Sequence, residues 1–359
     1  MALVAPPCTA RNGRCPFVPA AEGALRNTAV LSDHEPAAHL LRVSADDPEY
    51  RRLAAAEASF WQQVHPLSLE ATELESSGGP VDRYVNTRFT GDPHTDWVTT
   101  IPRWGTFRRG LLLGASSPSR ETRLLEVNPQ LHVILIDLSS GPAERRAAAL
   151  AARFPGRVVP ETADLNFVEL PPERYDLIVS SSTIHHVTNL EYLASQINRA
   201  LTPDGHFFLE DYVGERRFIF SETKRRLFET LYDRDIARQR GRKPGVIWHD
   251  ISDLSPFCGV RSDDILDVFR TYLDEVQVRT AGALVLPMTR THPVDYEELL
   301  QRLPRWKVVS VMLARKLGIR RRLVVDQQFL DELSLVGDAA SQAGLVRPGV
   351  AFAVYRKRR

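Results

Sequence analysis

Residues 110–137 bring together a short apolar run, a turn of small residues, a stretch long enough for a helix, and a second apolar run. The first run, 111–113, ends at Gly114, and the second, 133–136, ends at Asp137. Two strands joined through a helix form a parallel βαβ unit, which can lay an adenosyl ligand over the turn after its first strand. An acid that ends the second strand can accept both ribose hydroxyls. The stretch therefore predicts such a site, although its turn holds one glycine where nucleotide folds usually show two or three.

The segments that follow continue to alternate between strand and helix. We expect a short strand at 157–160, an almost continuously apolar strand within 175–183, an amphipathic helix at 189–201 and a further strand at 206–214. Near-continuous apolar character is typical of parallel strands that helices cover on both faces. The alternation predicts an α/β fold with a doubly wound, Rossmann-like sheet.

The flanks of this centre suggest how the chain is divided. Residues 1–45 are rich in Pro, Ala and Gly and are interpreted as a loose leader, and 46–105 as a helical cap. Residues 216–260 and 285–345 interrupt the alternation and are interpreted as helical insertions. The core is then expected to comprise 106–284 together with the closing strand in 346–359.

Charge and cysteine content exclude several classes of protein. The formal net charge of +1 argues against a nucleic-acid partner. The three cysteines, Cys8, Cys15 and Cys258, have no partner at metal-ligand spacing, so we expect no metal site. No window approaches the roughly 20 apolar residues of a membrane span, and the N-terminus lacks the apolar core of a signal peptide. We expect a cytoplasmic protein with no membrane partner, and a homodimer is left open.

The order of these segments resembles that of the class I S-adenosylmethionine-dependent methyltransferases. The resemblance covers about residues 82–284, and the closing strand at 350–357 fits the same sheet. It includes segments before and after the alternating centre, which is more specific than any one motif. In chain order these are Tyr84-Val85-Asn86, Arg88, Gly91-Asp92-Pro93, Asp96-Trp97, and Arg261-Ser262-Asp263-Asp264-Ile265-Leu266.

The resemblance implies a cofactor, S-adenosylmethionine, and a set of residues that bind it. Asp137 would accept hydrogen bonds from the ribose hydroxyls, and Asp164 would accept one from the exocyclic amine of adenine. The family usually shows Gly-x-Gly-x-Gly in the first turn, so a turn that holds no ligand remains an alternative here. The implied cofactor-binding residues are Gly114, Ala115, Ser116, Asp137, Leu138, Asp164, Leu165 and Ser181.

The resemblance also places a histidine pair beside the transferred methyl group. His185 and His186 follow the strand that ends near Ser181, and a neutral imidazole there can remove a proton from a hydroxyl. A histidine that only shapes the pocket is the alternative, because proximity and alignment can supply most of the rate. The insertions are expected to form a substrate lid, and the candidate substrate-binding residues are Tyr212, Trp248 and His249.

The expected function is therefore methyl transfer from S-adenosylmethionine to a small or medium-sized acceptor. A hydroxyl of a sugar or secondary metabolite is the expected acceptor group. Two alternatives stay open. One is an S-adenosylmethionine-binding biosynthetic enzyme that catalyses a reaction other than methylation, and the other is a catalytically silent, methyltransferase-like partner subunit.

Overall fold

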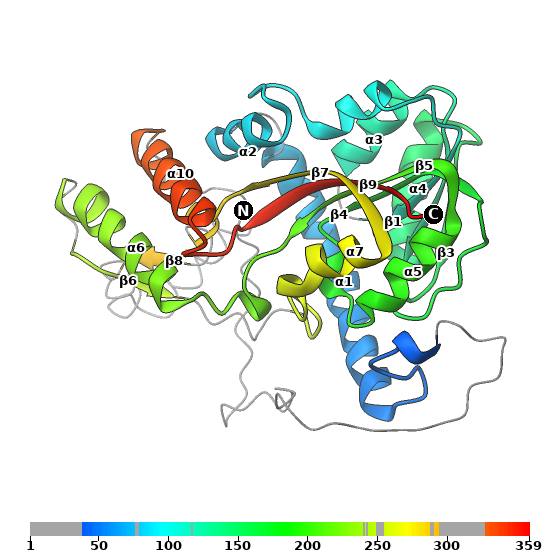
Figure 1. Cartoon of the computed structure of the whole chain (residues 1–359), viewed down its shortest axis with the longest axis horizontal. Coiled ribbons are helices and arrows are strands. Elements are labelled where there is room, and N and C mark those ends of the chain that lie inside the picture. The colour runs from blue at the N-terminus through cyan, green and yellow to red at the C-terminus, as the bar shows by residue number, and fades with distance from the viewer. Residues whose placement is uncertain are drawn as a thin grey trace.

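A seven-stranded sheet forms the centre of the computed structural model, which describes residues 38–75, 79–115, 118–239, 241, 243–248, 255–287, 291–293 and 327–359. The strand order is β3-β2-β1-β4-β5-β9-β7 (Figure 1). The first five strands are parallel, and β9 runs antiparallel to both β5 and β7. The predicted doubly wound α/β sheet is confirmed. The strands are β1 (Arg109–Leu113), β2 (His132–Asp137), β3 (Val158–Thr162), β4 (Tyr175–Ser181), β5 (Leu201–Tyr212), β7 (Leu273–Ala281) and β9 (Val350–Lys357).

Apolar side chains fill the space on both faces of this sheet. Leu111 and Leu113 of β1 belong to one buried cluster, and Leu112 belongs to the other, because successive side chains of a strand point to opposite faces. The first cluster is covered by α5 (Leu190–Ala200) and α7 (Ile265–Tyr272). The second is covered by α3 (Pro118–Val127) and α4 (Ser140–Arg153). Burial on both faces explains why these strands read as unbroken apolar runs.

The N-terminal part of the described chain is helical. It comprises α1 (Pro48–Glu75), α2 (Pro80–Thr90) and a 3-10 helix, η2 (Trp97–Arg103). Two side chains of α1, Tyr50 and Glu57, contact loops that follow β3 and β4. Because both loops follow the carboxyl ends of their strands, α1 lies at the edge of the sheet where α/β folds bind ligands.

A smaller group of elements lies at the end of the molecule away from β3 (Figure 1). It contains α6 (Glu222–Tyr232), α10 (Gln327–Gln342) and the short antiparallel pair β6 (Val246–Trp248) and β8 (Thr291–Pro293). Phe228 and Leu330 belong to the hydrophobic cluster between these helices. Much of the predicted insertion 285–345 lies outside the described residues. None of the helices in the described ranges has both the length and the apolarity that crossing a bilayer requires.

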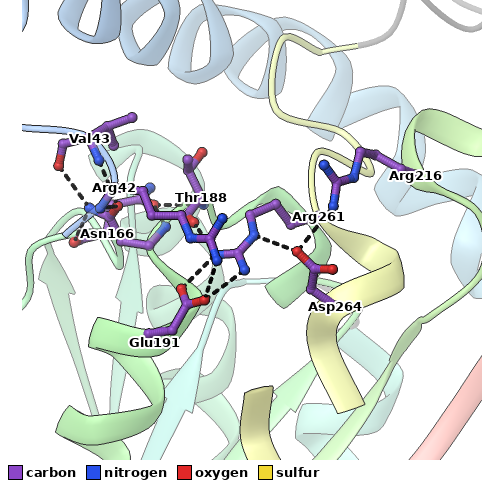
Figure 2. Close-up of polar contacts among 9 residues, drawn as sticks. Arg42, Val43, Asn166, Thr188, Glu191, Arg216, Arg261 and Asp264 are labelled. Atoms are coloured by element: carbon purple, nitrogen blue, oxygen red, sulfur yellow. Dashed lines mark hydrogen bonds and ion pairs between the residues drawn. The ribbon is translucent and has the colours of Figure 1, made fainter. Parts of the chain in front are cut away.

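An ion-pair network joins the chain before α1 to α5 and α7 (Figure 2). Glu191 of α5 accepts from Arg42 Nη2 at 2.8 Å and from Arg261 Nη1 at 2.6 Å. Arg261 Nε also donates to Asp264 at 2.8 Å, and Arg216 Nη2 lies 3.1 Å from the same Asp264 oxygen. The network holds the segment before α1 and the segment before α7 against α5.

Candidate active site

The turn between β1 and α3 is built on a single glycine. Gly114 has φ +82°, in the left-handed region that favours glycine, and a Cβ there would lie 2.1 Å from Thr183 Oγ1. Ala115 is not among the described residues with positive φ, and its side chain is buried. A glycine is therefore not required at Ala115. Ser116, the third predicted residue of this turn, lies outside the described residues.

Asp137, at the end of β2, holds the turn from the side. Its Oδ2 accepts from the Ala115 N–H at 2.9 Å, and its Oδ1 accepts from the Ser139 N–H at 2.9 Å. A carboxylate offers about four lone-pair sites in all, so both oxygens keep the capacity to accept from ribose hydroxyls. Leu138 follows directly and is half-buried.

Asp164, in the loop after β3, is held by the N-terminal helix. Its Oδ2 accepts from the Tyr50 hydroxyl at 2.6 Å, and its Oδ1 accepts from the Asn166 N–H at 2.9 Å. Burial and the neighbouring carboxylate raise the pKa of Tyr50 above its usual range, so the hydroxyl remains a donor. Leu165 is buried in the core. Tyr50 was missed in the sequence, which gives no signal of a contact across 114 positions.

A small pocket lies between Gly114, Trp97 and Ser181. Arg120 of α3 lines it, and its Nη1 donates to Ser181 Oγ at 2.9 Å and to Glu210 Oε2 at 2.7 Å. Ser181 Oγ in turn donates to Glu210 Oε2 at 2.8 Å. The pocket therefore joins the glycine turn to the end of β4, where the methionine part of the cofactor is expected.

The predicted histidine pair lies in the short 3-10 turn Ile184–His186 after β4, and each ring contacts a buried carboxylate. His185 Nδ1 lies 2.5 Å from Oδ1 of Asp211, which is fully buried in β5. His186 Nδ1 lies 2.8 Å from Oε1 of Glu57, which is 3% exposed. When each carboxylate accepts the Nδ1 proton, Nε2 is the nitrogen that carries the lone pair in the neutral ring. Both rings thus have an oriented nitrogen for a base or a ligand.

Glu57 connects the histidine pair to two further segments. Its Oε1 also accepts from Trp61 Nε1 at 2.7 Å, and its Oε2 accepts from the Phe257 N–H at 2.9 Å. Burial alone raises the pKa of Glu57, but His186 and these donors together lower it to about 2, so the carboxylate is ionised. Glu57 is not among the site residues predicted from the sequence. Its signal was an acid four residues before Trp61, on the side of α1 that faces the protein.

Tyr212 and Trp248, two of the predicted substrate-binding residues, meet at one hydrophobic cluster. Tyr212 ends β5, and its hydroxyl donates to the Glu215 carbonyl at 2.8 Å. Trp248 of β6 packs against the same hydrophobic cluster as Tyr212, and so does Cys258. His249 lies outside the described residues. The structure thus brings Tyr212 and Trp248 into one apolar region, and their contact with substrate stays a prediction.

Comparison with known proteins adds a family match to this geometry. Residues 113–207 match the model of a family described as "Methyltransferase domain". A search of curated proteins finds no match to the chain.

The chain is also similar to solved structures of three different enzymes. An O-methyltransferase from a trans-AT polyketide synthase multienzyme of Brevibacillus brevis, in complex with S-adenosyl-L-homocysteine, is 13% identical, with a TM-score of 0.43 over 84% of this chain and 79% of that chain. Phosphoethanolamine N-methyltransferase 2 of Haemonchus contortus, in complex with S-adenosyl-L-methionine, is 18% identical, with a TM-score of 0.39 over 73% of this chain and 52% of that one. The cyclase SpnF is 12% identical, with a TM-score of 0.42 over 73% and 79%.

The matched segment begins at the end of β1 and extends into β5. It therefore includes the Gly114 turn, Asp137, Ser181 and both histidines, but not the flanking segments at 84–97 and 261–266 on which the resemblance also rested. The part of the chain that holds these features is therefore similar to a methyltransferase domain.

Proposed function

We propose that the chain transfers the methyl group of S-adenosylmethionine to a hydroxyl of a small or medium-sized acceptor, such as a sugar or a secondary metabolite. The observation that carries the proposal is the histidine pair after β4, in which each Nδ1 faces a buried carboxylate. Such a carboxylate orients the ring and stabilises the imidazolium that forms when Nε2 takes a proton. An amine acceptor, which is protonated near neutral pH, and a carbon acceptor differ from a hydroxyl in the proton that a histidine would have to remove.

The residues at the edge of the sheet fit the cofactor. Gly114 leaves the turn open at φ +82°, where a side chain would be both strained and in collision with Thr183. Asp137 retains lone pairs for the ribose, and Ser181 lines the adjoining pocket. When bound, S-adenosylmethionine supplies a methyl group on a positively charged sulfur, which leaves with the bonding electron pair.

The acceptor's proton defines the role of the histidines. His186, or His185, would take the hydroxyl proton on Nε2 while the acceptor oxygen attacks the methyl carbon in line with the sulfur. Tyr212 and Trp248, with His249 next to Trp248 in the sequence, would line the acceptor side. Asp164 Oδ2 would accept a hydrogen bond from the adenine amine if the Tyr50 hydroxyl shares this oxygen or moves away from it.

Isothermal titration of the full chain with S-adenosylmethionine and with S-adenosylhomocysteine tests the cofactor part of the proposal. We expect both to bind with one site per chain. Binding of neither to a cooperatively folding protein would contradict the proposal and favour a silent, methyltransferase-like subunit.

The acceptor is tested by incubation with S-adenosylmethionine and a panel of phenols, sugars and amines. We expect S-adenosylhomocysteine to form with hydroxyl acceptors. Release of S-adenosylhomocysteine with amines alone would contradict the acceptor class. Conversion of an added compound without release of S-adenosylhomocysteine would instead favour a non-methylation reaction.

A further inference from the structure

His185, His186 and Cys258 place one potential ligand atom each so that all three lie within 4.8 Å of one another. We propose that these three side chains bind a single zinc ion and leave its fourth position open to water or the acceptor. Zinc bound by imidazole nitrogen and thiolate has bond lengths of about 2.0–2.3 Å, so tetrahedral ligands lie roughly 3.3–3.8 Å apart. The three side chains would have to bring these atoms from within 4.8 Å of one another to this spacing when the ion binds.

The carboxylates behind the rings give the strongest support. Asp211 accepts at His185 Nδ1 and Glu57 at His186 Nδ1, which directs the lone pair to Nε2 in both rings. Histidines that bind metals almost always donate their other N–H to a carboxylate, a carbonyl or water, which fixes the ring and raises its basicity. Here both rings have a carboxylate in this position. Asp211 is itself held by the Ile184 N–H at 2.6 Å.

The loop that carries Cys258 is hydrogen-bonded to Glu57, the carboxylate that also contacts His186. Oε2 of Glu57 accepts from the N–H of Phe257, while Oε1 contacts His186. On the other side, the carbonyl of Gly259 accepts from the Arg217 N–H at 2.7 Å. One buried carboxylate therefore sets the spacing between the second histidine and the cysteine. Such preorganisation keeps three ligands from distant parts of the chain together before a metal arrives.

The ligand set favours zinc among divalent ions. Two imidazoles and one thiolate match the borderline-soft preference of Zn²⁺, whereas Mg²⁺ and Ca²⁺ prefer oxygen ligands. Three protein ligands with an open position are typical of catalytic rather than structural zinc sites. The two ionisable carboxylates that face the rings balance the charge of the cation. The sequence predicts no metal site, because Cys258 has no ligand near it in the chain, and only the fold brings it to the histidines.

The inference replaces the histidine base of the proposed function with a metal ion. Its consequence for the acceptor rests on the proposed function, whereas the binding of zinc does not. A hydroxyl acceptor on the open position would be acidified by the ion, as metal-bound water is. The hydroxyl proton would then pass to a solvent water molecule, because both Nε2 atoms are bound to the ion. The metal thus takes the place of the histidine base at the same position.

Cobalt substitution offers a direct test on the full chain, in a background where Cys8→Ser and Cys15→Ser remove the other thiols. Protein freed of metal by a chelator is titrated with Co²⁺ and, separately, with Zn²⁺, without S-adenosylmethionine. We expect one ion per chain and a thiolate-to-cobalt charge-transfer band in the near ultraviolet. Cys258→Ser should abolish the band and weaken zinc binding at least tenfold. Glu57→Gln should weaken zinc binding by about 10- to 100-fold while the band remains.

His132→Gln serves as the matched control, because His132 is exposed on β2 far from Cys258 in the fold. We expect this variant to bind zinc as the parent does. Absence of the band, or zinc affinity that Cys258→Ser leaves unchanged in a variant that unfolds like the parent, overturns the inference. Separate titration with S-adenosylmethionine keeps the two proposals distinct: cofactor binding without metal binding refutes only the zinc site, and metal binding without cofactor binding refutes only the proposed methyl transfer.

Discussion

Glu57 on α1 and His186 after β4 form a buried pair in which 2.8 Å separates Oε1 from Nδ1. The pair joins α1 to the turn that follows the carboxyl end of β4. Because Glu57 also accepts from the Phe257 N–H, three segments far apart in the sequence meet at one carboxylate. The histidine pair is therefore positioned by the fold on both sides, by β5 through Asp211 and by α1 through Glu57.

Replacement of Glu57 by glutamine should reduce stability in a pH-dependent way. The pKa of Glu57 is lowered from 4.5 to about 2 in the folded chain, so its ionised form stabilises the fold above about pH 4.5. This contribution is lost as the pH falls from about 4.5 to about 2. At about 1.4 kcal/mol per pKa unit, Glu57→Gln should cost on the order of 3–4 kcal/mol at pH 7 and progressively less toward pH 3.

Urea unfolding of the parent and Glu57→Gln at pH 7, 5 and 3.5 measures this difference. Glu222→Gln, at a side chain that is 81% exposed, is the control and should show no such trend. A cost for Glu57→Gln that stays constant across this range would contradict the assigned ionisation.

Arg261→Met should destabilise the fold more than the loss of an exposed arginine. The Arg261 side chain is 5% exposed, and its removal leaves Glu191 with Arg42 and Asp264 with Arg216. Breaking a buried pair typically costs 3–5 kcal/mol, and the remaining arginines should reduce this to about 2–3 kcal/mol.

The matched control is Arg270→Met, because Arg270 also pairs with two carboxylates but is 52% exposed. Its cost should stay below about 1 kcal/mol. The two free energies of unfolding, measured by urea at pH 7, check the comparison. Equal costs would show that burial of the Arg261 network contributes nothing.

Gly114→Ala should impair both folding and cofactor binding. The added Cβ meets Thr183 Oγ1 at 2.1 Å, and φ +82° adds strain for any residue with a side chain. Together these should cost about 2–5 kcal/mol, from about 1–2 for the left-handed backbone and about 1–3 for the collision.

Gly156→Ala separates the two effects, since Gly156 has φ +72° but open space around its Cβ. Only the strain of about 1–2 kcal/mol should remain there. Thermal unfolding with and without S-adenosylmethionine distinguishes loss of stability from loss of binding. A Gly114→Ala variant as stable as Gly156→Ala would rule out the close packing against Thr183.

Much of the fold followed from local patterns in the sequence. The apolar runs of β1, β2 and β4 and the acids and small residues at their ends predicted a doubly wound sheet, because burial on both faces leaves that pattern in each strand. The turn was predicted with reservations about Ala115, and the structure shows that Gly114 alone takes the positive φ among its described residues.

The contacts that shape the site could not be predicted in the same way. Tyr50 reaches Asp164 and Glu57 reaches His186 across more than a hundred residues, and neither has a periodicity that names its partner. Metal ligands are recognised in a sequence by short spacing, which Cys258 lacks, and its proximity to the histidines is created by tertiary packing. The contacts of Tyr50 and Glu57 can be recognised only from the position of α1 in the fold.

Asp137→Asn should weaken S-adenosylmethionine binding beyond what the loss of one backbone acceptor costs in stability. Asp137 accepts one backbone N–H on each oxygen, and an amide keeps only one of these acceptors and loses the charge that strengthens bonds from ribose hydroxyls. Hydrogen bonds to a charged group contribute about 1.5–3 kcal/mol, so affinity should fall by roughly 10- to 100-fold. Asp176→Asn is the control, because Asp176 likewise accepts backbone N–H groups, from Arg108 and Arg109, but at the opposite end of β1. Isothermal titration should find its cofactor affinity unchanged. Equal losses in the two variants would mean that Asp137 supports the turn and does not contact the ribose.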